Sequence, residues 1–143
     1  MAKVVAVNIS DVKGVPKNTV EIGELVAGHG LKGDAHAGNW HRQVSLLGVE
    51  SIEKMQVSGI KGPGAGSFAE NITTEGIELF SLPVGTRLAI GDTLLEVTQI
   101  GKECHNKCAI YHQAGQCVMP REGIFARVLK GGLIQAGDEV KTV

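Results

Sequence analysis

The sequence predicts a mainly β fold, an antiparallel β-barrel with two or three short helices, in a single domain that spans residues 1–143. Two observations support this prediction. Short apolar and β-branched runs recur along the chain with turn residues between them. Glycine supplies 20 of the 143 residues, about twice its usual share, which is typical of a chain with many turns.

The expected strands are the short apolar runs themselves, at residues 3–10, 20–25, 43–47, 72–74 and 94–100. Two further segments, residues 86–97 and 132–143, each place a Gly-Asp pair between short apolar runs. Glycine adopts positive φ at little cost, so each pair predicts the tight turn of a β-hairpin.

Two segments are expected to form helices. In residues 49–56, apolar side chains recur at helical spacing and charged side chains occupy the other face. Residues 120–130 place Pro120 in the first turn and Gly131 directly after the end, which is the usual order of these two residues in a helix.

Composition excludes several functions. The formal net charge of -1 and an aromatic content of 3% argue against nucleic-acid binding, which requires basic side chains and stacking surfaces. No apolar run approaches the roughly 20 residues that span a bilayer, so no membrane partner is expected. The first residues lack the features of a secretion signal, and a cytoplasmic location is therefore expected.

Three cysteines, Cys104, Cys108 and Cys117, lie within fourteen residues and carry the strongest chemical signal. An odd number of cysteines in a reducing compartment argues against a disulfide framework and favours thiol chemistry or metal binding. Cys104 follows the strand expected at residues 94–100. The basic side chains of Lys102, His105 and Lys107 surround it and favour the thiolate, which attacks sulfur or binds a soft metal.

Two other interpretations of the cysteines stay open. Free cysteines are often small buried apolar residues with no chemical role. Alternatively, the three cysteines with His105 or His112 could supply four zinc ligands, although the C-x3-C-x8-C spacing lacks the paired C-x2-C motifs of zinc ribbons. This second interpretation predicts a non-catalytic binding module stabilised by zinc.

A second group of candidate site residues surrounds the loop at residues 28–42, which is rich in glycine and histidine. Arg42 can bind a phosphate or carboxylate with two hydrogen bonds, and His36 and His41 lie close to it in sequence. A solvated surface loop is the alternative.

Three more residues complete the set of candidates. Glu70 and Asn71 can orient a ligand, although Asn71 can equally close a local turn. Arg121 lies at the expected start of the second helix, where a positive charge is unfavourable unless an anion is bound nearby.

Several motifs together resemble the MOSC domain family, and the resemblance covers nearly the whole chain. The motifs are Gly33–Gly38 (GDAHAG), His41–Leu47 (HRQVSLL), Phe68–Thr73 (FAENIT), Leu82–Thr86 (LPVGT), Ile90–Asp92 (IGD), Glu96–Gln99 (EVTQ) and Met119–Ala126 (MPREGIFA). The resemblance implies a β-barrel similar to that of pyruvate kinase. It also implies a protein that binds the molybdenum cofactor or transfers sulfur to it.

The resemblance also implies roles for particular residues. Cys104 corresponds to the family's sulfur carrier or molybdenum ligand, with Cys108 and Cys117 as alternatives. An anionic pterin would then lie among the basic and polar candidates, which are His36, His41, Arg42, Glu70, Asn71 and Arg121. A separate cysteine desulfurase, dependent on pyridoxal phosphate, would supply the sulfur. A molybdenum-dependent reductase of N-hydroxylated compounds is a further alternative, and catalytic turnover is left open.

Overall fold

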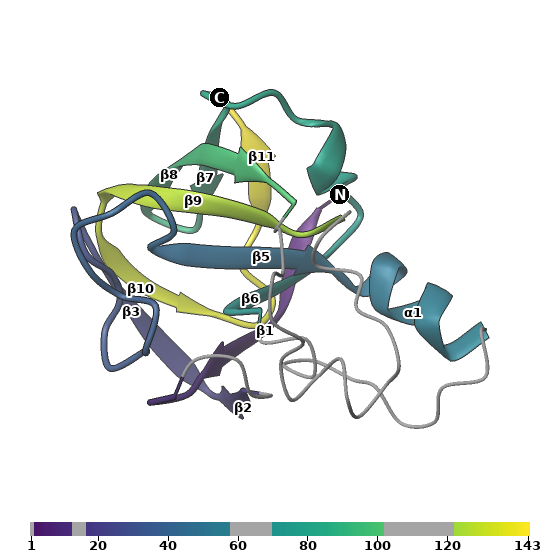
Figure 1. Ribbon diagram of the computed structural model, residues 1–143, viewed down its shortest axis with the longest axis horizontal. Helices are drawn as coiled ribbons and strands as arrows, with labels where there is room; N and C mark the ends of the chain where they lie inside the picture. Colours follow the sequence, from purple (N-terminus) through teal and green to yellow (C-terminus); the bar gives the residue numbers. More distant parts are fainter. Residues whose placement is uncertain (1, 13–16, 58–69, 102–121) are drawn as a thin grey trace.

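The computed structural model describes residues 2–12, 17–57, 70–101 and 122–143 (Figure 1). These residues form a mainly β structure, as the sequence predicts. Its elements are β1 (Lys3–Ile9), β2 (Asn18–Val20), β3 (Ile22–Val26), β4 (Gly30–Leu31), β5 (Val44–Gly48), α1 (Val49–Val57), β6 (Ile72–Glu75), the 3-10 helix η1 (Leu79–Ser81), β7 (Arg87–Ile90), β8 (Thr93–Ile100), β9 (Ile124–Lys130), β10 (Gly132–Gln135) and β11 (Val140–Thr142). Neither helix among the described residues is long and apolar enough to cross a membrane.

Most of the strands belong to one eight-stranded sheet in the order β11-β7-β8-β9-β5-β6-β1-β2, and β10, β3 and β4 form a second sheet. The large sheet curls strongly but is not closed by strand pairing (Figure 1). Its two ends nevertheless approach each other. The amide of Val4 in β1 donates to the carbonyl of Asp138 at 2.8 Å, and the amide of Val140 donates to the carbonyl of Ala2 at 3.0 Å. The architecture is therefore that of an incompletely closed barrel.

One strand pair departs from the antiparallel arrangement that the sequence predicts. β5 and β6 are parallel, with Leu46 opposite Ile72, and α1 connects them. Parallel neighbours need a crossover connection, which the helix provides. The helix expected at residues 49–56 is thus confirmed, and it belongs to a β-α-β unit within an otherwise antiparallel sheet.

The prediction of a helix over residues 120–130 is wrong for the part of this range that the structure describes, because Ile124–Lys130 form strand β9. This strand lies between β8 and β5 and pairs with both. Ile124, Phe125 and Ala126 are all at most 1% exposed, so both faces of the strand are covered. A strand buried on both faces is a continuous apolar run, and its periodicity cannot be distinguished from that of a buried helix.

Of the two expected Gly-Asp hairpins, one is confirmed and one is corrected. Gly91 has φ +56° in the turn between β7 and β8, and Ile90 pairs with Thr93 across it. Gly137 also has positive φ, at +96°, but the strands on either side do not pair with each other. Instead β10 pairs with β3 and β11 pairs with β7, so this turn connects the two sheets.

The register of the large sheet separates two faces. Val7, Leu46, Ile72 and Ile124 are aligned across four strands, and all four belong to the main hydrophobic core. Because adjacent side chains on a strand point to opposite faces, the next aligned row points away from that core. This second face carries the candidate site.

Candidate functional site

The face opposite the core carries a row of aligned residues near the middle of the sheet. Ser45 on β5 is opposite Phe125 on β9, and Phe125 is opposite Gln99 on β8. Ser45 and Phe125 are each 1% exposed, whereas Gln99 is only partly buried. The side chain of Gln99 is therefore accessible at one end of an otherwise covered row.

His41 and Arg42 meet Gln99 at this position. The side-chain oxygen Oε1 of Gln99 accepts a hydrogen bond from Nε of Arg42 at 3.1 Å and lies 3.1 Å from Nε2 of His41. The carbonyl of His41 also accepts a hydrogen bond from the hydroxyl of Thr98. Two of the basic residues predicted from sequence are thus brought together at Gln99, which lies near the end of β8, the strand that precedes Cys104 in the sequence.

Arg42 is placed to bind an anion. Its guanidinium carbon lies 5.2 Å from the centroid of the Phe125 ring, and the side chain is half-buried. Within the described part of the chain, its charge is not neutralised by any Asp or Glu side chain. The hydrogen bond to Gln99 uses Nε and leaves the terminal nitrogens to bind a ligand, and these nitrogens suit a phosphate or carboxylate.

The cysteine-bearing segment begins and ends beside this group. Nε2 of Gln99 donates to the carbonyl of Gly101 at 2.8 Å, and the amide of Gly101 donates to the carbonyl of Gly123 at 2.6 Å. The two chain ends that flank residues 102–121 are thereby held together. The predicted site residues Cys104, Cys108, Cys117 and Arg121 lie outside the described residues.

His36 lies in a different environment, a buried cluster with Lys17 and Asp34. Nζ of Lys17 is 2.8 Å from Oδ1 of Asp34 and 3.1 Å from Nδ1 of His36, and it also donates to the hydroxyl of Ser10 at 3.1 Å. The side chains of Lys17 and Asp34 are fully buried. The sequence did not point to Lys17, because it lies in a run of turn residues, 14–18, where a lysine is expected to be exposed.

Hydrogen bonds hold Asp34 in its charged form. Burial by itself raises the pKa of Asp34, but hydrogen bonds from His36, Lys17 and Ser10 outweigh burial and hold this pKa well below its usual range. The amides of Ser10 and His36 donate to its two oxygens at 3.0 and 2.9 Å. Asp34 therefore ties the end of β1 to the glycine-rich loop.

Trp40 joins the buried cluster to the exposed pair. Its indole Nε1 donates to the carbonyl of His36 at 2.7 Å, and its ring packs edge-on against His41 with centroids 5.7 Å apart. Trp40 itself is 36% exposed. The loop thus presents His41 and Arg42 toward β8 while it buries the side chain of His36.

Glu70 and Asn71 are completely buried directly before β6. The side-chain oxygen of Asn71 accepts from the amide and the hydroxyl of Ser45 at 3.0 and 3.2 Å, and its nitrogen donates to the carbonyl of Asn8 at 3.3 Å. Glu70 accepts from the hydroxyl of Thr73 at 2.7 Å. The side-chain amide group of Asn71 therefore links β1 and β5 to the start of β6, and in this arrangement it stabilises the fold.

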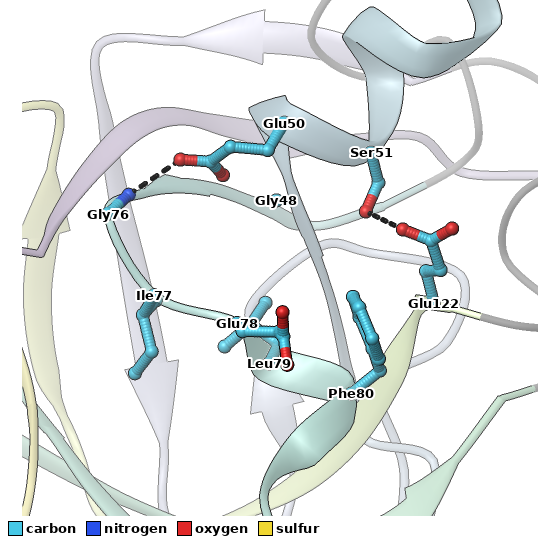
Figure 2. Close-up of a pocket in the computed structure, with 9 residues that line it drawn as sticks. All are labelled: Gly48, Glu50, Ser51, Gly76, Ile77, Glu78, Leu79, Phe80 and Glu122. Atoms are coloured by element: carbon cyan, nitrogen blue, oxygen red, sulfur yellow. Dashed lines mark hydrogen bonds between the residues drawn. The ribbon is translucent and has the colours of Figure 1, made fainter.

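A cavity of about 260 Å³ lies at the opposite end of β5, beside α1 and η1 (Figure 2). The protein donates hydrogen bonds to its carboxylates: the hydroxyl of Ser51 donates to Glu122 at 2.6 Å, the amide of Gly76 donates to Glu50 at 2.8 Å, and the hydroxyl of Ser81 donates to Glu78. No basic residue is among the described residues that line the cavity. This cavity is therefore unsuited to an anion.

Comparison with known proteins supports the fold and identifies the family. The structure is similar to the YuaD protein of Bacillus subtilis, with a TM-score of 0.80 and 19% identity over 98% of this chain and 94% of that chain. It is similar to YiiM from Geobacillus stearothermophilus, with a TM-score of 0.78 and 21% identity over 100% and 75% of the two chains. For YiiM from Escherichia coli the TM-score is 0.69, with 20% identity over 100% and 70%.

No curated protein sequence matches the chain significantly. The family model of the MOSC domain, however, matches residues 33–141, which is most of the chain and includes most of the loop together with β5, β6 and β8. The resemblance seen in the sequence motifs is thereby confirmed. The chain therefore belongs to the MOSC domain family, a family associated with the molybdenum cofactor.

Proposed function

We propose that this protein binds the molybdenum cofactor through its anionic pterin and carries or transfers sulfur on Cys104. One observation carries the proposal: the half-buried cation Arg42 lies against Gln99, on the strand that leads to Cys104, with no acidic partner among the described residues. An anion bound by Arg42 would lie close to where the cysteine-bearing segment leaves the sheet.

The donor groups around Gln99 fit an anionic ligand. The terminal nitrogens of Arg42 are hydrogen-bond donors with a full positive charge, and partial burial strengthens their attraction for a phosphate group. His41 lies beside Arg42 and can add one more donor. Bound there, the molybdenum cofactor would supply a metal centre that accepts a sulfur ligand. The described lining of the acidic cavity beside η1 includes no Arg, Lys or His side chain.

The proposed chemistry of Cys104 is persulfide exchange. The Cys104 thiolate attacks the terminal sulfur of a persulfide on a donor protein, for which we propose a cysteine desulfurase that uses pyridoxal phosphate. A new sulfur–sulfur bond forms on Cys104, the original sulfur–sulfur bond breaks, and the donor leaves as a thiolate. No external oxidant is required, because the transferred sulfur already has the necessary oxidation state.

Intact-mass measurement of the complete protein tests the sulfur-carrying role. Protein treated with inorganic polysulfide should gain the mass of one sulfur atom, which a thiol reductant removes. The Cys104→Ser variant should lose this gain, and the Cys117→Ser variant should keep it. Retention of the added sulfur in the Cys104→Ser variant would show that Cys104 is not the sulfur carrier.

Binding of the anion is tested separately, and the same preparation decides the zinc alternative. Arg42→Met should weaken binding of molybdopterin at least tenfold, whereas Arg87→Met should not, because Arg87 is exposed on β7 and pairs with Glu96. Equal affinities of the two variants would contradict the proposed site. One equivalent of tightly held zinc, with unfolding on chelation, would instead support the zinc-stabilised module.

A further inference from the structure

The side chain of Gln99 has a fixed orientation, because each end of its amide group has a partner that allows only one arrangement. Nε of Arg42 is always a donor, so the atom that faces it at 3.1 Å must be the oxygen Oε1. The carbonyl of Gly101 is always an acceptor, so the atom that faces it at 2.8 Å must be the nitrogen Nε2. Two independent contacts therefore turn the Gln99 oxygen toward Arg42 and His41.

This orientation decides which nitrogen of His41 carries the proton. Nε2 of His41 lies 3.1 Å from Oε1 of Gln99, and an amide oxygen can only accept a hydrogen bond, so Nε2 must be the N–H. A neutral imidazole carries one proton, which leaves a lone pair on Nδ1. His41 is exposed, and its Nδ1 makes no hydrogen bond to any residue that the structure describes. Nδ1 is therefore the nitrogen that can take up a second proton.

Arg42 and His41 share an acceptor that has no charge. A protonated His41 would place two positive charges on the one oxygen of Gln99, whereas an anion held by the terminal nitrogens of Arg42 would compensate both. The other groups packed against the His41 side of the loop, Thr98 on β8 and Trp40, are uncharged. The acidic side chains of the loop and of β8 are already paired, Asp34 with Lys17 at 2.8 Å and Glu96 with Arg127 at 2.7 Å and Arg87 at 3.6 Å.

We infer that Gln99 is a positioning residue that holds His41 as the Nε2–H tautomer, and that Nδ1 of His41 takes up a proton from solvent when an anion binds at Arg42. The inference rests on the proposed function only in requiring an anion at Arg42. The protonated Nδ1 is then the further donor that His41 contributes to the site. Linkage is reciprocal, so proton uptake strengthens anion binding by the same factor. The site therefore holds an oxyanion more tightly at mildly acidic pH than at mildly alkaline pH.

Nitrogen-15 NMR of the complete, uniformly labelled protein tests the tautomer. The ring nitrogens of His41 are assigned by their loss in the His41→Gln variant, and long-range proton–nitrogen correlations report which of them carries the proton. At about pH 8 we expect a protonated Nε2 and an unprotonated Nδ1. Gln99→Met removes the acceptor and should let the proton distribute over both nitrogens, whereas Gln135→Met, a change in an exposed side chain of β10, should not. A proton on Nδ1 in the original protein, or an unchanged spectrum in folded Gln99→Met, would overturn the positioning role.

Titrations with inorganic sulfate at two pH values test the proton linkage. The charge of sulfate is constant over this range, so a change in affinity comes from the protein. Lowering the pH from about 8 to about 5.5 should strengthen sulfate binding at least about threefold, which is the effect expected of one more positive charge at an exposed site. His41→Gln should lose most of this pH dependence, whereas His29→Gln, in an exposed histidine of the same loop, should keep it. An undiminished pH dependence in His41→Gln would overturn the linkage.

Two further variants separate this inference from the proposed function. Arg42→Met should abolish sulfate binding, and binding that persists would contradict the anion site and the proton linkage together. Sulfate binding that depends on Arg42 but not on pH would overturn the linkage and leave the anion site intact. Gln99→Glu keeps an acceptor oxygen and adds a negative charge, so His41 should keep its proton on Nε2 while sulfate binds weakly at both pH values. If Gln99→Met does not fold, the spectra of the original protein and of Gln99→Glu decide the tautomer.

Discussion

Nε of Arg42 donates a hydrogen bond to Oε1 of Gln99 at 3.1 Å, although 57 positions separate these residues in the sequence. The contact joins the glycine-rich loop to the end of β8. It gives Arg42 a fixed orientation over the Phe125 ring and places a cation beside the start of the cysteine-bearing segment. Both chemical components of the proposed site, an anion-binding group and a thiol, therefore depend on the end of β8.

Replacing Gln99 by Ala should break the contact between the glycine-rich loop and the end of β8. The variant removes the acceptor shared by Arg42 and His41, and we expect it to lower the free energy of unfolding by about 1–2 kcal/mol and to weaken molybdopterin binding. Urea denaturation and a binding titration measure the two effects. Gln135→Ala is a matched control, because that side chain is exposed on β10. Unchanged binding by Gln99→Ala would argue against a site at this position.

Breaking the buried ion pair should cost far more than breaking an exposed one. Lys17→Met leaves the Asp34 carboxylate buried without its cation, and we expect a loss of about 3–5 kcal/mol in the free energy of unfolding. Lys32→Met is the control, because Lys32 lies 3.9 Å from Glu24 with both side chains largely exposed. We expect it to lose less than about 1 kcal/mol in chemical denaturation. Similar losses in both variants would show that burial of the pair has no energetic consequence.

Acid should destabilise the protein partly through Asp34. Its pKa is lowered in the folded state, so the folded chain binds fewer protons here than the unfolded chain as the pH falls. The stabilisation is complete above the pKa of an unfolded aspartate, about 4, and is lost progressively at lower pH as the pKa of the folded state is approached. Denaturation midpoints measured from pH 6 downward should therefore fall less steeply for Asp34→Asn than for Asp92→Asn, an exposed turn control. Equal slopes would contradict this assignment.

Asn71 should be required for stability even when no ligand is present. Asn71→Ala removes the buried side-chain oxygen that accepts from the amide and the hydroxyl of Ser45, and we expect a loss of about 1–3 kcal/mol in the free energy of unfolding. Asn39→Ala, in the exposed part of the loop, is the control. A stable Asn71→Ala variant that fails to bind molybdopterin would instead give this residue a ligand-binding role.

The glycine-rich loop should depend on Gly30 through close approach of the backbone. A Cβ atom at Gly30 would lie 2.6 Å from the carbonyl oxygen of Gln43, and φ is +123°. Gly28 also has positive φ, at +70°, but a Cβ atom there would meet nothing within 4 Å, so Gly28→Ala carries only the backbone cost of about 1–2 kcal/mol. Thermal unfolding should therefore show Gly30→Ala to be the less stable variant. The reverse order would be inconsistent with this packing.

Local patterns predicted much of the fold. β1, β5, β6 and β8 lie within about a residue of the runs expected for them, and α1 matches its expected helix, because apolar periodicity and turn residues act over short distances. β9 shows the limit of such patterns. Its sequence suits a helix with proline before it and glycine after it, and only hydrogen bonding to β8 and β5 on its two edges makes it a strand.

The amino-acid sequence was sufficient to establish the family and the mainly β class, since the MOSC motifs and the short apolar runs are visible in the chain. The three cysteines and the basic residues of the loop also suggested the chemistry that we propose for the site. Which of those residues meet depends on the folded chain, which brings Arg42 to Gln99 and buries Lys17 against Asp34 and His36. The physical reason is that burial and long-range hydrogen bonding depend on strand register. A lysine within a run of turn residues has no local feature that distinguishes a solvated ammonium from one that is buried against an aspartate.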